Sequence, residues 1–326
     1  MIMTKAIFDF LPDIPPVPMF ADNPINRDDH RRDDANWLKV TMHSSNARYL
    51  IIVDDKIAMS VTPSLSKATF QYDEIKALSE NILQEAIYLG LWDGVPYFTL
   101  KITLNESEQL FDKHPSIKAI DLRSIALGMV GVTNQEGLLG VLSQAKALFN
   151  WHETHPFCSK CGAETSMASA GYKRVCVSDA CGASHFPRTD PVVIMLVLDG
   201  DQCLLGRGHN WPVGRYSALA GFMEPGESIE QAVRREVFEE TAVKVGRVHY
   251  LCSQPWAFPT NLMIGCFAEA QSRDITLDPI EMEDAKWFHR DEIKAALNSP
   301  DESSLLVAPA IAIAHNLLRA WVENGD

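Results

Sequence analysis

Three glutamates close together in the sequence carry its strongest chemical signal. Glu236, Glu239 and Glu240 are spaced so that, on a helix, they lie on one face. Like charges at this spacing repel each other by roughly 0.2–0.5 kcal/mol per pair. A divalent cation removes that cost, and Mg²⁺ and Mn²⁺ bind carboxylates together with the phosphate oxygens of a substrate. The spacing predicts such a site, although the string alone also fits a solvated acidic face paired with Arg234 and Arg235.

A loop followed by a helix must position these carboxylates. Gly221, Pro225 and Gly226 punctuate the loop, and Ser228 is suited to cap the first turn of the helix with its side-chain oxygen. Apolar residues then recur every three or four positions, which predicts one buried stripe: Ile229, Ala232, Val233 and Val237.

Four cysteines form a second candidate site. Cys158 and Cys161 are separated by two residues, Cys176 and Cys181 by four, and the two pairs by fourteen. Two close pairs of thiolates suit tetrahedral Zn²⁺, and four cysteines leave no open position, so one structural zinc ion per chain is predicted. The alternatives are four free buried thiols, or a redox pair at Cys158 and Cys161.

The glutamate motif resembles the Nudix box of Nudix hydrolases. The resemblance rests on Gly221, Glu227 after five intervening residues, and the string Arg-Glu-apolar-x-Glu-Glu-x-Ala-apolar that begins at Arg235. Ala242 stands where that family usually has Gly. A left-handed conformation there costs Ala roughly 1–2 kcal/mol, so we expect a different helix exit.

Residues 253–263 narrow the resemblance. This stretch, Ser-Gln-Pro-Trp-Ala-Phe-Pro-Thr-Asn-Leu-Met, is rich in proline and aromatic residues and is interpreted as a rigid loop. It resembles the signature of the NADH pyrophosphatase family of Nudix hydrolases, with Ala257 in place of a usual Pro. The resemblance covers roughly residues 150–326 well and residues 1–150 loosely.

This resemblance implies an enzyme that cleaves NADH, and NAD, to nicotinamide mononucleotide and AMP. Some family members also remove NAD caps from RNA, and a homodimer is implied. Two or more Mg²⁺ or Mn²⁺ ions neutralise the pyrophosphate and lower the pKa of the attacking water. The implied metal ligands are the carbonyl of Ala220 and the carboxylates of Glu236, Glu240 and Glu281, with Glu239 as a ligand or as the base. The implied substrate contacts are Phe186, Phe222, Gln254, Asn261, Met263 and Ala314, with the two phenylalanines sandwiching a ring.

The totals of the sequence limit the classes of partner. The chain has 326 residues and a formal net charge of −14, with 46% hydrophobic and 22% charged residues. Such acidity disfavours DNA and anionic membranes as partners. There is no run of 18 apolar residues and no secretory signal, and seven cysteines fit a reducing cytosol, so we expect a cytoplasmic protein.

The expected architecture is α/β (α+β) in four segments. Residues 1–35 form an irregular arm or flexible tail, and residues 36–150 form an N-terminal, mostly β domain. A small zinc ribbon covers 151–187, and a Nudix α/β/α sandwich with a mixed sheet covers 188–326. In the N-terminal domain we expect strands at 49–53, 57–59, 86–91 and 97–102, and helices at 117–129 and 137–152. In the last segment we expect strands at 192–198, 203–206, 216–222, 245–252, 262–269 and 285–288 and a C-terminal helix at 308–322.

Two other functions remain open from the sequence. The chain could be a Nudix hydrolase of ADP-ribose or dinucleoside polyphosphates, against which residues 253–263 argue. It could also be a zinc-ribbon adaptor for RNA or protein with an inactive Nudix domain, although no carboxylate of the box is missing.

Overall fold

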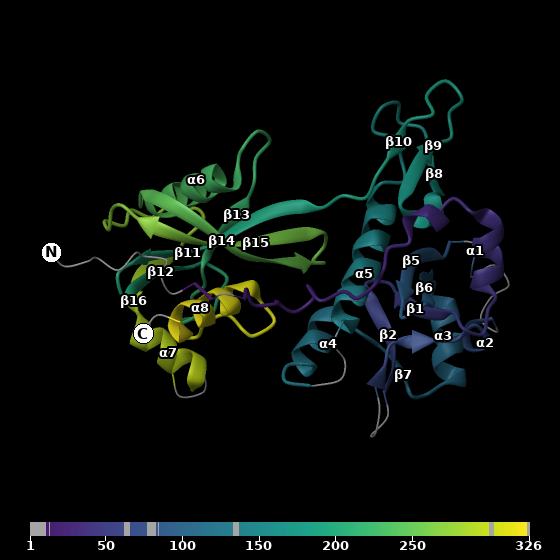
Figure 1. The fold of residues 1–326 in the computed structure, drawn as a ribbon, viewed down its shortest axis with the longest axis horizontal. Coiled ribbons are helices and arrows are strands. Elements are labelled where there is room, and N and C mark those ends of the chain that lie inside the picture. Colours follow the sequence, from purple (N-terminus) through teal and green to yellow (C-terminus); the bar gives the residue numbers. More distant parts are fainter. Residues whose placement is uncertain are drawn as a thin grey trace. The chain divides into compact units, whose positions relative to one another are not determined.

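A computed structural model describes residues 11–12, 14–61, 66–76, 83, 85–132, 137–299 and 303–324. The chain forms two compact units (Figure 1). Unit 1 comprises residues 1–21, 190–255 and 261–326, and unit 2 comprises residues 22–189 and 256–260.

Unit 1 is built on a six-stranded mixed sheet in the order β14-β15-β11-β12-β16, with β13 paired to β11. Its strands are β11 (Asp190–Asp199), β12 (Gln202–Arg207), β13 (Leu219–Phe222), β14 (Val245–Trp256), β15 (Asn261–Ala270) and β16 (Asp284–His289). Strand β11 runs parallel to β15 and antiparallel to β12 and β13. The helices are α6 (Ile229–Thr241), α7 (Arg290–Asn298) and α8 (Ile313–Glu323).

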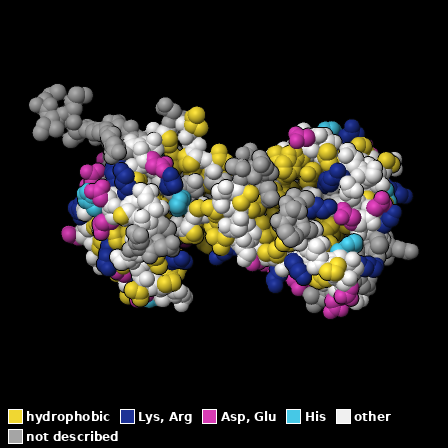
Figure 2. Space-filling view, turned by 90° about the horizontal axis from the view of Figure 1, so that it is seen from below, with side chains coloured by type: hydrophobic (Ala, Val, Ile, Leu, Met, Phe, Trp, Pro, Cys, Tyr) yellow, Lys and Arg dark blue, Asp and Glu magenta, His cyan; other side chains and the backbone are white. Residues whose placement is uncertain are grey.

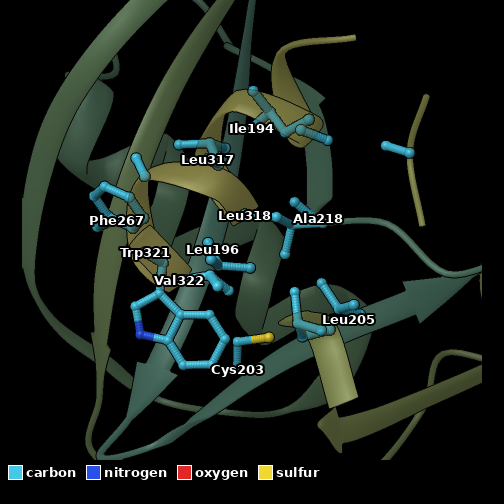
Figure 3. Packing of buried hydrophobic residues seen from close by; sticks show 14 of the residues in the cluster. Ile194, Leu196, Cys203, Leu205, Ala218, Phe267, Leu317, Leu318, Trp321 and Val322 are labelled. Atoms are coloured by element: carbon cyan, nitrogen blue, oxygen red, sulfur yellow. The ribbon is translucent and has the colours of Figure 1, made fainter. Parts of the chain in front are cut away.

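The alternating side chains of β11 divide the core of unit 1 into two layers. Ile194, Leu196 and Leu198 pack with residues of α7 and α8, as Figure 3 shows for Ile194 and Leu196 beside Leu317, Leu318 and Trp321. Val193, Met195 and Val197 pack on the other face with Ala232, Val233 and Val237 of α6. Because successive residues of a strand point to opposite faces, a continuous apolar strand serves both layers. The expected α/β/α sandwich with a mixed sheet is therefore confirmed (Figure 1).

Unit 2 contains a seven-stranded sheet and a separate three-stranded one. The larger sheet consists of β1 (Arg48–Val53), β2 (Lys56–Val61), β3 (Ser66–Lys67), β4 (Thr69–Phe70), β5 (Ile87–Trp92), β6 (Val95–Ile102) and β7 (Ile117–Ile120). The smaller sheet consists of β8 (Thr165–Ala168), β9 (Lys173–Cys176) and β10 (Ser184–His185). Helices α1 (Ala35–Met42), α2 (Tyr72–Ile75), α3 (Leu104–Lys113), α4 (Leu122–Gly128) and α5 (Leu138–Thr154) complete this unit.

In unit 2, the structure confirms one local prediction and contradicts another. The hairpin expected through Asp93 and Gly94 is present, and both residues have positive φ (50° and 76°), as a tight turn between two twisted strands requires. The single helix expected over 117–129 is wrong. Residues 117–120 instead pair with β2 as β7, and Asp121 then caps α4 by accepting from the N–H of Ser124.

Residues 1–35 were expected to form an irregular arm or a flexible tail, and the described part from residue 14 onwards is packed rather than free. Phe20 is only 1% exposed, and Ile25 and Asp28 are also buried. Asn26 exchanges two backbone hydrogen bonds with Leu91 of β5, and a short 3-10 helix follows at Asp29–Arg31. Proline excludes regular structure here without excluding burial.

Other element boundaries in the second half of the chain also differ from expectation. Strand β14 continues through Pro255 to Trp256, so the irregular part of the 253–263 stretch is only the turn at 257–260. Helix α8 begins at Ile313, several residues later than the expected helix.

The surface does not segregate its charges on the face shown in Figure 2, where acidic and basic side chains are interspersed. A search of the described residues for a helix with the length and hydrophobicity of a membrane span finds none.

Candidate active site and metal centres

Helix α6 is fixed at both ends by local interactions. Ser228 accepts from the N–H of Gln231 at 3.3 Å, and the Gln231 side chain accepts from the N–H of Ser228 at 2.8 Å. This reciprocal pair satisfies two backbone donors that a helix start otherwise leaves free. At the other end, Ala242 adopts a left-handed conformation (φ 58°) and donates to the carbonyl of Phe238. The expected change of helix exit is wrong, because Ala242 takes the conformation that Gly usually supplies.

Helix α6 places Glu236 against strand β13, and Glu281, the ligand expected from a distant loop, is exposed. Glu236 and Glu240 are buried, with 8% and 7% exposure, whereas Glu239 is exposed. A Cβ atom on Gly221 would overlap with the carboxylate atoms of Glu236. Because glycine has no side chain, the backbone at position 221 can lie directly against the carboxylate of Glu236.

Burial and mutual repulsion make this cluster costly to ionise. Burial, with smaller contributions from Glu236, Glu281 and Glu239, raises the pKa of Glu240 from 4.5 to about 8. Burial also raises the pKa of Glu236, although Arg235 opposes the shift. Oε2 of Glu240 is buried and has no hydrogen-bond partner in the part of the chain that the structure describes. An unsatisfied carboxylate oxygen beside other glutamates is the kind of donor that a hard divalent cation prefers.

Arg235 organises the rest of the cluster. Its guanidinium donates to both carboxylate oxygens of Glu227 (2.6 and 2.9 Å), to Glu236 (2.8 Å) and to Glu239 (2.9 Å). It also donates to the carbonyl of Phe222 at 2.8 Å, which ties the loop to the helix. These contacts lower the pKa of Glu227 to about 2 and raise the pKa of Arg235. From the sequence, Arg235 was expected only to pair with the acidic face of the helix. The position of Glu227 in the motif was the one sequence feature that could have indicated that Arg235 also binds the loop.

The four cysteines form the second centre. Their sulfur atoms all lie within 4.8 Å of one another, with 3.8 Å between Cys158 and Cys181 and 3.4 Å between Cys161 and Cys176. Tetrahedral Zn–S bonds of about 2.3 Å place sulfur atoms roughly 3.8 Å apart, so the arrangement fits zinc.

The surroundings of Cys158 favour the thiolate that binds a metal. Burial opposes its ionisation, but the amide hydrogens of Lys160 and Cys161 and the ring of His185, 3.3 Å from the sulfur, lower its pKa to about 6. Gly162, with φ 79°, closes the tight turn that aims these amides.

Several predicted substrate residues share the α8 face of the sheet. Val192 pairs with Phe222 on one side and with Met263 on the other, so the three residues form one row across the sheet. Met263 packs against the same core layer as Ala314, which is buried on α8. Phe222 is 58% exposed and Asn261 is partly exposed, so both can meet a ligand. Phe186 is 67% exposed in unit 2, and its pairing with Phe222 stays a prediction.

Gln254 lies differently from the other predicted contacts. Its side chain is fully buried, and both amide hydrogens are donated to backbone carbonyls, those of Met19 and Ile311. A direct hydrogen bond from this amide group to a nucleotide stays a prediction, which the observed arrangement does not favour.

The fold and the carboxylate centre together define a Nudix hydrolase, and known sequence families agree. The NUDIX domain family matches residues 188–307, and the NADH pyrophosphatase zinc ribbon family matches residues 153–186. A third family, the NADH pyrophosphatase-like rudimentary NUDIX domain, matches residues 51–151. The chain belongs to the NADH pyrophosphatase family of Nudix hydrolases.

Similar proteins extend over most of the chain. The NAD-capped RNA hydrolase NUDT12 of Macaca fascicularis is 35% identical over 93% of this chain and 73% of its own length. The NAD-capped RNA hydrolase NudC of Mycobacterium bovis is 38% identical over 73% of this chain and 75% of its own. The mitochondrial NAD(P)H pyrophosphatase NUDT13 of Mus musculus is 45% identical over 56% and 54%, respectively. A solved NUDIX hydrolase from Nitrosomonas europaea aligns with 51% of this chain and 90% of its own at 20% identity, with a TM-score of 0.41.

Proposed function

We propose that this protein hydrolyses the pyrophosphate of NADH and NAD to nicotinamide mononucleotide and AMP, and that it also removes NAD caps from RNA. The observation that carries the proposal is the buried Oε2 of Glu240, which lacks a partner among the described residues and lies within a group of carboxylates. The family membership and the names of the relatives support NAD(H) as the substrate.

The chemistry requires charge neutralisation. Two or more Mg²⁺ or Mn²⁺ ions, held by Glu236, Glu240, Glu281 and the carbonyl of Ala220, would neutralise the pyrophosphate and lower the pKa of the attacking water. Glu240 would have to lose a proton to serve as a ligand, because its raised pKa keeps it largely protonated near neutral pH.

The remaining groups of the site orient the water and the loop. Glu239 is exposed and held by Arg235, which leaves its second oxygen available to a water molecule, so we assign it the role of ligand or base. Arg235 also holds the carbonyl of Phe222, two residues beyond Ala220, and so keeps β13 in place against the helix.

The nucleotide is held, in this proposal, on the α8 face of the sheet. Phe222 offers an exposed ring for stacking, and Met263 and Asn261 lie along the same edge. The expected second ring is Phe186, which is exposed in unit 2. The expected contribution of one stacked ring is about 0.5–1.5 kcal/mol beyond area burial.

We also propose one structural zinc ion per chain on Cys158, Cys161, Cys176 and Cys181, a homodimer, and a cytoplasmic location. The proposed segments are an arm at 1–35, an N-terminal domain at 36–150, a zinc ribbon at 151–187 and a Nudix domain at 188–326. Light scattering after size-exclusion chromatography tests the dimer, and cell fractionation tests the location.

The deciding experiment is product analysis on NADH, NAD and an NAD-capped RNA, with Mg²⁺ and Mn²⁺ supplied in turn. We expect nicotinamide mononucleotide and AMP from the free dinucleotides and a 5′-monophosphate end on the RNA. Glu240→Gln is the control for contaminating activity. A protein that cleaves ADP-ribose efficiently but not NADH would overturn the proposal, and so would one that binds RNA without turnover.

A further inference from the structure

Gln254 is a fully buried polar side chain of unit 1. It has 0% exposure and projects from β14 into the core layer beneath α8. Nε2 donates to the carbonyls of Met19 and Ile311, both at 2.9 Å, and Oε1 accepts from the N–H of Ile313, also at 2.9 Å. One side chain on β14 thus joins two other backbone segments, at Met19 and at Ile311–Ile313, which are far apart in the sequence.

The bond to Ile313 completes the start of α8. A helix leaves its first N–H groups without partners inside the helix. Serine, threonine, aspartate or asparagine usually supplies a cap, but the N-cap residue here is Ala312, which has no side-chain acceptor. Because Ile313 is buried, water cannot satisfy its N–H in place of Gln254.

The first turn of α8 in turn supports the proposed nucleotide face. A Cβ atom on Gly265 of β15 would lie 2.9 Å from Cδ1 of Ile313, so the helix sits directly on that strand. Met263 precedes this contact by two residues and packs, with Ala314, into the same core layer. The carboxylates of α6 belong to the opposite face of the sheet.

The same side chain fixes the arm within unit 1. Met19 accepts one amide hydrogen from Gln254, and the neighbouring Pro18 and Phe20 are buried. Two carbonyls fix the orientation of the Gln254 amide group, and the arm supplies one of them, that of Met19. In this orientation the amide oxygen faces the N–H of Ile313.

We propose that Gln254 is a positioning residue for NADH hydrolysis, which sets the first turn of α8 against β15 and thereby shapes the nucleotide-binding face, with Met19 of the arm holding its orientation. This inference rests on the proposed function. Gln254 acts here through Ile313, Met263 and Ala314 and does not touch substrate.

The first test is Gln254→Met, which keeps the length of the side chain but removes every hydrogen bond. We expect KM for NADH to rise on the order of tenfold, while kcat stays within about threefold because the carboxylate centre is on the other face. Amide hydrogen exchange of residues 311–318 should accelerate in the same variant. The matched control is Gln144→Met in unit 2, where Gln144 also holds the arm, through Asn23, and where neither change is expected.

The second test is Gln254→Glu, which separates positioning from loss of fold. The carboxyl group that this substitution introduces can, when protonated, still donate to one carbonyl and accept from Ile313. Once ionised, the same group would face two carbonyls and have no hydrogen to donate. KM relative to wild type, measured at each pH, should therefore be near one at low pH and rise as pH increases. The exchange of residues 311–318 should follow the same trend.

These measurements distinguish positioning by Gln254 from direct contact with the nucleotide. A raised KM in Gln254→Met with unchanged exchange at 311–318 would mean that Gln254 contacts the nucleotide directly, and the inference fails. Equal effects on KM in Gln144→Met would also overturn it. If the wild-type protein does not cleave NADH, the proposed function fails, whereas the exchange measurement still reports whether Gln254 holds α8.

Discussion

Glu240→Gln should make the metal-free protein more stable at alkaline pH while it removes catalysis. In the folded protein, burial and neighbouring carboxylates raise the pKa of Glu240 from 4.5 to about 8. The folded state therefore binds a proton more tightly than the unfolded state between these values. Stability must fall as pH rises through this window and must level off above it. A glutamine at this position resembles the neutral carboxyl group and cannot ionise, so it adds no such pH dependence to the stability of the protein.

The expected magnitude follows from the pKa change. One pKa unit corresponds to about 1.36 kcal/mol, so the raised pKa of Glu240 lowers the stability of the wild type by about 3 kcal/mol at pH 7 and by about 5 kcal/mol above pH 8, relative to a group that keeps its ordinary pKa of 4.5 in the folded state. The variant and the wild type should agree near pH 4.5. Above pH 8 the variant should melt later, on the order of 10 °C for a unit of this size.

The measurement is thermal unfolding from pH 5 to pH 9 of protein that contains zinc but no Mg²⁺ or Mn²⁺. Glu239→Gln is the matched control, because that carboxylate is exposed, and it should keep most of the wild-type slope. Adding Mg²⁺ should stabilise the wild type and not Glu240→Gln. Turnover of the variant on NADH should fall by about 10²–10³ with the fold intact. Equal slopes in wild type and Glu240→Gln, or near wild-type turnover in the folded variant, would refute the assignment of Glu240 as a buried metal ligand.

Three further predictions concern other parts of the molecule. Elemental analysis should find one zinc ion per chain in the wild type and none in Cys176→Ser, whose ribbon should also become open to proteolysis because so small a sheet depends on its metal; a zinc-free, stable wild type would contradict this. Phe222→Ala and Phe186→Ala should each raise KM for NADH several-fold to about tenfold with little change in kcat, and equal losses on ADP-ribose would show that the rings do not read nicotinamide. Ala242→Gly should stabilise unit 1 by about 0.5–1 kcal/mol in urea unfolding, because it relieves a left-handed alanine (φ 58°), and a destabilised variant would mean that Ala242 is not strained.

The parts that sequence predicted well depend on local physics. The start of α6 at Ser228 and its buried stripe follow from a cap and a helical period, and both are present in the structure. The hairpin at Asp93 and Gly94 follows from a turn that needs positive φ. The four cysteines are also predictable from local sequence, because a single reversal of the chain between the two close pairs brings all four together.

The errors arose where long-range contacts override local preference. Residues 117–120 carry no strong strand signal, and only their pairing with β2 makes them a strand. The arm is rich in proline, which predicts irregular backbone but not its burial. The role of Gln254 was inaccessible for the same reason, because its three partners lie at positions 19, 311 and 313.

The arrangement around Arg235 explains which charges of the carboxylate cluster are compensated and which are not. Arg235 pairs with Glu227, Glu236 and Glu239, so three negative charges share one guanidinium. Glu240 is the deepest of the four carboxylates and receives no part of this compensation among the described contacts. Its proton therefore takes the place of a counter-charge near neutral pH. Glu240 would lose that proton on serving as a ligand to Mg²⁺ or Mn²⁺, so metal affinity should increase with pH up to about 8.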